Sequence, residues 1–234
     1  MNKQIIALGG GGFSMEPENP LLDDYIIRHA RRENPSICFL PTASGDSADY
    51  MNRFYQSFKA KNCEPTHLSL FKPPTRNLRE FVLQQDIIYV GGGNTVNLIL
   101  LWKHWGLDQY LHEAWQEGTL LAGLSAGSIC WFEEGITDSY GDGLEPVNGL
   151  GFLKGSHSPH YDCELNRRPT FQKFITEGKL QEGIAADDGV ALHYVDDQLH
   201  TIVKSRKNAN AYQVHMQGGQ LKEEKLSSHY LGKP

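Results

Sequence analysis

Short apolar runs of strand length alternate with segments of helical periodicity along the first half of this chain. The runs, most of which carry β-branched residues, occupy residues 3–8, 36–41, 67–70, 86–90 and 119–123. The clearest helical face repeats at i, i+3, i+4, i+7 and i+8 and consists of Leu107, Tyr110, Leu111, Ala114 and Trp115. Residues 22–30 and 50–58 show further helical periodicity. This alternation predicts an α/β fold in which helices flank a largely parallel sheet.

The pattern changes after about residue 190. The stretch VALHYVDDQLHTIV (190–203) predicts two antiparallel strands joined across Asp196-Asp197, and AYQVHM (211–216) predicts another strand. No repeat, low-complexity tract or linker divides the 234 residues. We therefore expect a single α/β domain, residues 1–234, with antiparallel strands late in the chain.

Composition and charge argue against several classes of protein. The 22 Lys and Arg residues are outnumbered by 28 Asp and Glu residues, so the net charge of −6 gives no electrostatic support for nucleic-acid binding. No apolar stretch has the length of a membrane span, and MNKQIIALGGGG predicts a strand rather than a signal peptide. The four cysteines form no CxxC pair, which favours free thiols in the cytoplasm over disulfides or a zinc site.

The segment TLLAGLSAGSICWF (119–132) places Ser125 between two glycines, where a buried strand gives way to a helix carrying residues 129–132. In this setting Gly-x-Ser-x-Gly is the pattern of a nucleophile elbow, a turn so tight that the serine adopts strained backbone angles. The amide of Ala126 and the helix dipole would face negative charge developing on a substrate oxygen. A plain strand-to-helix turn is the alternative.

A serine hydroxyl needs a base to become nucleophilic, and the base needs an orienting group. Among ten histidines we select His160, because it follows Pro159 in GSHSPHY, after a segment rich in turn formers (141–155) that predicts a loop. A structural histidine is the alternative. Spacing leaves the orienting acid open among four aspartates: Asp138, Asp162, Asp187 and Asp188.

Two more glycine-rich corners follow predicted strands, at Gly9–Gly12 and Gly91–Gly93. Ligands of parallel sheets gather at such strand ends, so three glycine-lined corners could surround one site. The dinucleotide fingerprint Gly-x-Gly-x-x-Gly fails at both corners, because Ser14 and Val96 stand where the third glycine belongs. No P-loop Gly-Lys-Ser/Thr is present either, which argues against nucleotide binding.

GGGNT (91–95), GLSAGS (123–128) and SPHY (158–161), in this order and spacing, resemble the peptidase E family. These serine peptidases include aspartyl dipeptidase and are similar to cyanophycinase. The resemblance covers roughly residues 86–192. It implies a flavodoxin-like core related to class I glutamine amidotransferases, with serine in place of their cysteine nucleophile. The implied order Ser, His, Asp along the chain differs from the order in lipases and esterases.

Carried over residue by residue, the resemblance implies that Ser125 is the nucleophile and His160 the base. The family's acid corresponds to Asp188, just before Gly189, where relatives commonly have glutamate. Asp138, a short way after the elbow, is the reserve acid.

The resemblance also assigns the groups around the reacting bond. The amides of Gly93, with Gly92 next, and of Ala126 would form the oxyanion hole. Asn94 and Arg168 are the expected substrate contacts, with Arg168 pairing bidentately with an acidic substrate side chain. For Arg168, a solvated basic helix start is the alternative.

The sequence thus predicts a cytoplasmic serine peptidase that hydrolyses small peptides, Asp-X dipeptides among them, through an acyl-enzyme and without cofactor or metal. One alternative is a hydrolase of the same fold acting on isoaspartyl or cyanophycin-type peptides. Another is a non-catalytic protein that binds a small molecule and keeps the elbow as a turn. Neither nucleic acid nor membrane is an expected partner, and a homodimer is left open.

Overall fold

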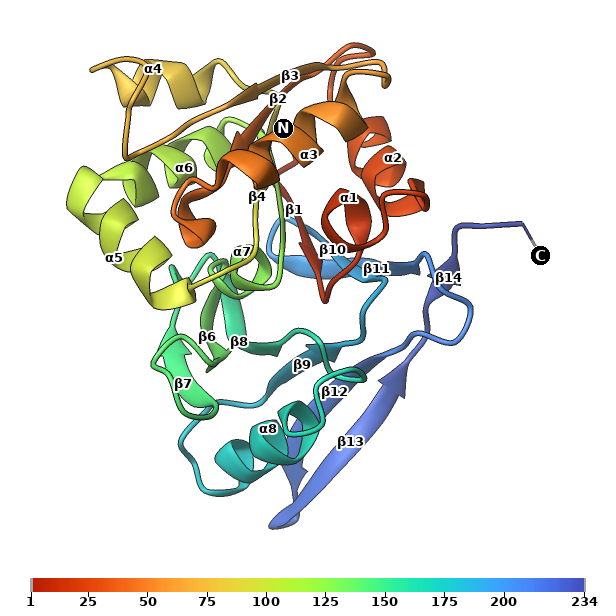
Figure 1. The fold of residues 1–234 in the computed structure, drawn as a ribbon. Coiled ribbons are helices and arrows are strands. Elements are labelled where there is room, and N and C mark those ends of the chain that lie inside the picture. Colours follow the sequence, from red (N-terminus) through yellow and green to blue (C-terminus); the bar gives the residue numbers. More distant parts are fainter. Residues whose placement is uncertain (1, 234) are drawn as a thin grey trace.

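The computed structural model describes residues 2–233 and contains two β-sheets with helices packed against them (Figure 1). The strands of the larger sheet are β1 (Gln4–Leu8), β2 (Ser36–Leu40), β3 (Glu64–His67), β4 (Ile87–Val90), β5 (Leu120–Leu124), β10 (Val190–Val195), β11 (Gln198–Lys204) and β14 (His229–Tyr230). Their order is β14-β11-β10-β1-β5-β4-β2-β3. Strands β1 to β5 all pair in parallel, and β10 adds antiparallel to β1. The predicted α/β fold with a largely parallel sheet is confirmed.

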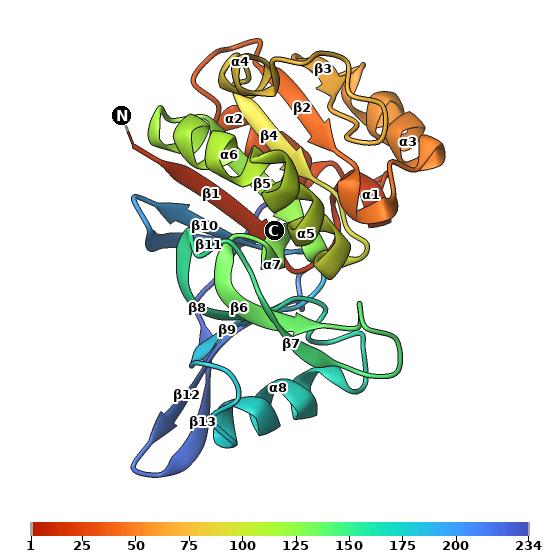
Figure 2. The ribbon, with the colours of Figure 1, turned by 90° about the vertical axis from the view of Figure 1, so that its left-hand side faces the viewer.

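Helices cover both faces of this sheet because successive strand residues point to opposite sides (Figure 2). Ile5 and Ala7 of β1 enter one apolar core, and Ile6 and Leu8 enter the other. The first core is closed by α4 (Leu78–Leu83), α5 (Thr95–Trp105) and α6 (Leu107–Gln116), and the second by α1 (Gly12–Met15), α2 (Leu21–Arg28) and α3 (Ala48–Phe58). A 3-10 turn, η1 (Thr42–Ser44), follows β2. The amphipathic segments of the sequence are therefore the helices that seal the sheet.

Four of the five predicted early strands coincide with β1, β2, β4 and β5. The fifth prediction, residues 67–70, is wrong, because β3 ends at His67. Its residues Glu64 to His67 pair with β2 at the edge of the sheet, where Pro65 is tolerated. Leu68 and Leu70 are buried beyond the strand, so their apolar character reports core packing rather than strand structure.

The second sheet has the strands β6 (Phe132–Thr137), β7 (Glu145–Asn148), β8 (Leu153–Ser158), β9 (Gly183–Ala186), β12 (Ala211–Gln217) and β13 (Gln220–Leu226). Their order is β13-β12-β9-β8-β6-β7, and α8 (Arg167–Thr176) packs against β12 and β13. The expected loop at 141–155 is wrong, because it contains β7 and the start of β8. The helix expected through residue 132 is also too long, since α7 (Ala126–Ile129) is a single turn and Phe132 begins β6.

The predicted hairpin at 190–203 is present as β10 and β11. Asp196 and Asp197 form its two-residue turn with φ angles of 49° and 67°. Both values lie in the left-handed region that a tight hairpin turn requires and that aspartate tolerates better than most residues. None of the helices in the described part of the chain has the length and hydropathy of a membrane span.

Candidate active site

Ser125 lies at the carboxyl end of β5 with φ 56° and ψ −119°, a backbone conformation that residues other than glycine rarely adopt. The two flanking glycines make this turn sterically feasible. A Cβ on Gly123 would lie 2.2 Å from the carbonyl oxygen of Gly127, and one on Gly127 would lie 2.3 Å from that of Val90. The geometry is that of a nucleophile elbow.

The three glycine-rich corners meet, because β1, β5 and β4 are adjacent parallel strands. A Cβ on Gly10 would lie 2.1 Å from Asp188 Oδ1 and 3.0 Å from His160 Nδ1. A Cβ on Gly92 would lie 3.2 Å from the Cβ of Ser125. Glycine at these corners thus makes room for the side chains of the predicted triad.

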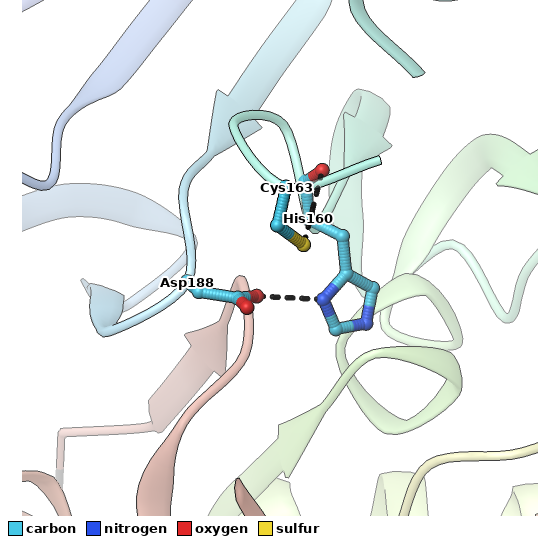
Figure 3. Close-up of side chains that lie close together, drawn as sticks. All are labelled: His160, Cys163 and Asp188. Carbon is cyan, nitrogen blue, oxygen red and sulfur yellow. Dashed lines mark hydrogen bonds and ion pairs between the residues drawn. The ribbon is translucent and has the colours of Figure 1, made fainter. Parts of the chain in front are cut away.

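His160 and Asp188 come from the second sheet, just beyond the ends of the parallel strands β8 and β9. His160 Nδ1 and Asp188 Oδ1 lie 2.7 Å apart, as Figure 3 shows, and both residues are buried. Burial alone would raise the pKa of the Asp188 carboxyl. The hydrogen bond and charge of His160 outweigh it and hold that pKa below its ordinary value. Asp188 is therefore an ionised partner that can orient the imidazole.

The end of β1 and the loop after it bind the backbone of all three segments that carry these side chains. The successive carbonyl oxygens of residues 8–10 accept hydrogen bonds from the amides of Ser125 (3.4 Å), His160 (3.0 Å) and Gly189 (3.0 Å). One loop thereby holds the backbone of the serine, of the histidine and of the residue after Asp188. His160 itself has a φ of 55°, so its orientation is imposed by the surrounding structure.

Within residues 2–233 the Ser125 hydroxyl forms no hydrogen bond, so it is not paired with His160. Catalytic hydrogen bonds often tighten only when substrate is bound. The amides of Gly93 and Ala126 likewise have no hydrogen-bond acceptor in the described chain, whereas the amide of Gly92 donates to the Tyr50 hydroxyl. Gly93 and Ala126 are therefore the free donors beside the serine.

A cavity of about 380 Å³ opens next to Ser125. It is lined by Gly93, Asn94, Ser125, Asp138, Ser139, Glu164 and Arg167. The Asn94 side chain caps α5 by accepting from the amide of Asn97, and it donates to the Ser139 carbonyl. Asn94 is thus both a helix cap and part of the cavity wall.

The two neighbouring arginines lie in different surroundings. Arg167 is buried in the cavity lining, donating to the Ile136 carbonyl (2.9 Å) and to Glu164 (2.7 Å). Arg168 is half-exposed, forms an ion pair with Glu223 of β13 and lies over two tyrosine rings. The structure therefore places Arg167, rather than the expected Arg168, beside Ser125.

The remaining candidate acids have other partners. Asp187 accepts a hydrogen bond from the amide of Asn210, and burial raises its pKa to about 6. Asp162 accepts from the amide of Asp188, which fixes the backbone at that position. Asp138 lies in the cavity wall without contacting His160. Of the four aspartates, Asp188 is the one hydrogen-bonded to the imidazole.

His157, three residues before His160, is a structural residue. It is fully buried, bonds to the Ile184 carbonyl and the Ser128 hydroxyl, and stacks on Phe132. Burial lowers its pKa to about 3, so it stays neutral.

Sequence reasoning missed three residues of the cavity wall: Ser139, Glu164 and Arg167. The adjacent arginines Arg167 and Arg168 indicated that an arginine could contact substrate. Only the structure, in which Arg167 is buried and Arg168 is not, shows which of them faces the cavity. Ser139 and Glu164 lie in turn-rich segments that carry no motif.

Comparison with known proteins gives a consistent result. The model of peptidase family S51 matches residues 5–202. A relative from Bacillus subtilis (strain 168), described as "Uncharacterized peptidase YgaJ", is 57% identical over 230 residues, which is 98% of this chain and 100% of the relative.

Two solved structures share the fold at 19% identity. A peptidase from an acI-B1 Actinobacterium aligns with a TM-score of 0.70 over 97% of this chain and 95% of its own. A putative peptidase E protein from Listeria monocytogenes EGD-e aligns with a TM-score of 0.58 over 97% and 100%. The chain therefore belongs to peptidase family S51, the peptidase E family of serine peptidases.

Proposed function

We propose that this peptidase hydrolyses small peptides through a Ser125–His160–Asp188 triad. The observation that carries the proposal is the buried 2.7 Å hydrogen bond between His160 Nδ1 and Asp188, formed next to a serine in elbow geometry. Asp188 holds the imidazole with its proton on Nδ1, which leaves Nε2 free to act as the base.

In the proposed mechanism Ser125 Oγ attacks the scissile carbonyl carbon while His160 Nε2 takes the hydroxyl proton. The amides of Gly93 and Ala126 stabilise the oxyanion. The intermediate collapses as His160 returns the proton to the departing amine, leaving an acyl-enzyme. Water, deprotonated by His160, then attacks the ester and releases the acid product and the serine.

The cavity supports small, charged substrates. The Arg167 guanidinium donates through Nε to Glu164 and through Nη1 to the Ile136 carbonyl, so its remaining nitrogen, Nη2, can bind a substrate carboxylate such as the side chain of an N-terminal aspartate. We therefore assign to Arg167 the role that the sequence suggested for Arg168. Asp138 can receive a substrate ammonium group from the same wall, whereas Glu164 is already paired with Arg167.

A β-linked Asp-Arg dipeptide is the second candidate substrate. Besides the Arg167–Glu164 pair, the cavity wall holds the Asp138 carboxylate, so it also matches a substrate that carries both a carboxylate and a basic side chain.

The test is a panel of Asp-X dipeptides, neutral dipeptides, tripeptides and β-linked Asp-Arg, given to wild type and to Ser125→Ala. Wild type should cleave at least one class, and Ser125→Ala should lose activity by a factor on the order of 10⁴ or more. The exposed Ser227 gives a matched control, and Ser227→Ala should behave as wild type. Equal hydrolysis by wild type and Ser125→Ala would eliminate the triad.

A further inference from the structure

We propose that a thiophilic divalent cation of the Zn²⁺ type binds between His160, Cys163 and Asp188 and switches the peptidase off. The imidazole nitrogen, the thiol sulfur and a carboxylate oxygen all lie within 4.8 Å of one another. Figure 3 shows the sulfur pointing into the space between the carboxylate and Nδ1. The inhibitory consequence rests on the proposed function, but the binding itself does not.

The donor set suits zinc. Nitrogen, sulfur and oxygen ligands bind Zn²⁺ at about 2.0–2.3 Å in tetrahedral geometry, which places neighbouring ligand atoms roughly 3.5 Å apart. Cys163 is exposed and lies in a turn three residues after His160, so a side-chain rotation can bring its sulfur within that range. The fourth position is left for water.

Charge also favours a divalent ion. A thiolate, the Asp188 carboxylate and a neutral imidazole exactly neutralise Zn²⁺, which limits the cost of placing the ion in a largely buried site. Zn²⁺ binds the thiolate form of cysteine, so the ion must displace the Cys163 thiol proton into solvent. Mg²⁺ and Ca²⁺ prefer oxygen ligands, so a site with one nitrogen and one sulfur ligand disfavours them. Arg206, 3.9 Å from Asp188, opposes any cation there.

Metal binding and the catalytic hydrogen bond exclude each other. His160 Nδ1 and Asp188 Oδ1 are 2.7 Å apart, too close for both to coordinate one ion, so their hydrogen bond must open. A neutral imidazole that coordinates through Nδ1 carries its proton on Nε2. The nitrogen that would accept the Ser125 proton is then occupied, and Asp188 no longer orients the ring.

The experiment measures binding and activity separately. Chelator-treated protein is titrated with Zn²⁺ by calorimetry and with Cd²⁺ by the ultraviolet absorption of a cadmium–thiolate bond. Wild type should bind one equivalent and show that absorption. Cys163→Ser should lose the absorption and bind Zn²⁺ at least about tenfold more weakly. The control is His200→Gln. His200 is exposed and lies beside His193, outside the proposed site, so this variant should bind the metal as wild type does.

The same proteins are assayed for peptide hydrolysis, each against its own metal-free rate. Zn²⁺ should inhibit wild type over the concentrations at which it binds, and Cys163→Ser should need at least about tenfold more. Equal Zn²⁺ affinity of wild type and Cys163→Ser, or no thiolate absorption, would overturn the site. Thiolate binding in a protein that cleaves no peptide would instead refute the proposed function and leave the metal site standing.

Discussion

At the level of single residues, the proposed catalysis depends on one contact, between His160 and Asp188. The sequence pattern selected His160, whereas Asp188 came only through the family resemblance, because spacing left four aspartates open. Their partners in the structure distinguish the four aspartates. Asp188 bonds to His160, Asp187 and Asp162 accept hydrogen bonds from backbone amides, and Asp138 lines the cavity. Such choices depend on where two distant loops meet, which local patterns do not encode.

Asp188→Asn tests the contact directly. The amide can no longer hold the imidazole with its proton on Nδ1, so kcat should fall by a factor on the order of 10³–10⁴ with little change in KM. Asp138→Asn, the reserve acid, should keep kcat within about tenfold of wild type and act mainly on KM. The reverse ranking of the two variants in steady-state kinetics would transfer the acid role to Asp138.

The two arginines make a second test at this scale. Arg167→Lys keeps the charge, but one ammonium group cannot bond to Glu164 and the Ile136 carbonyl and also bind a substrate carboxylate, so kcat/KM for Asp-X peptides should fall roughly 10-fold to 100-fold more than for neutral ones. Arg168→Lys, altering a residue paired with Glu223, should leave this ratio unchanged. A change of ratio in Arg168→Lys alone would restore the original assignment.

At the scale of elements, the glycine loop after β1 organises the site. Sequence patterns predicted the parallel strands and the amphipathic helices, because apolar periodicity reports burial directly. They failed for β7 and β8, where Pro146 and several glycines resemble a loop, and for the polar edge strand β13. Only β8 depends on parallel partners that other elements separate from it along the chain, β6 and β9. β7 and β13 each pair with the strand just before them, so it is their composition, rather than a distant partner, that conceals them.

Gly10→Ala tests the role of the loop. The added methyl would lie 2.1 Å from Asp188 Oδ1, so the carboxylate must move and its bond to His160 is lost. Activity should fall as far as in Asp188→Asn, while the protein remains folded because a side chain gives way rather than backbone. Gly92→Ala, whose methyl would lie 3.2 Å from Ser125 Cβ, should be milder. Full activity of Gly10→Ala would show that the loop does not position the triad.

At the scale of the whole molecule, the two sheets each bring part of the site. Ser125 comes from the eight-stranded sheet, and His160 and Asp188 come from the six-stranded one (Figure 1). The largely parallel sheet predicted from the sequence corresponds to the eight-stranded sheet, and the six-stranded sheet was not predicted as a second sheet. The glycine loop after β1 packs against the side chain of Asp23 at Gly12. Asp23 is buried and accepts a hydrogen bond from the Tyr89 hydroxyl.

Asp23 makes stability depend on pH. Burial raises the pKa of its carboxyl from 3.8 to about 7, against the opposing charge of Lys61. The folded state therefore holds a proton that the unfolded state releases, and this contribution to stability is lost as pH rises from about 4 to 7. Asp23→Asn mimics the protonated carboxyl. The free energy of unfolding of this variant relative to wild type should increase by roughly 3 kcal/mol between pH 5 and pH 8. A pH-independent difference in denaturant unfolding would contradict the assignment.

The proposed function requires Ser125 to act as a nucleophile activated by His160 and Asp188. The most direct measurement is the mass of the intact protein after reaction with a fluorophosphonate, followed by peptide mapping. We expect one adduct, on Ser125, with much slower labelling of Asp188→Asn and none of Ser125→Ala. Peptide hydrolysis by a wild-type protein that acquires no adduct on Ser125 would contradict it.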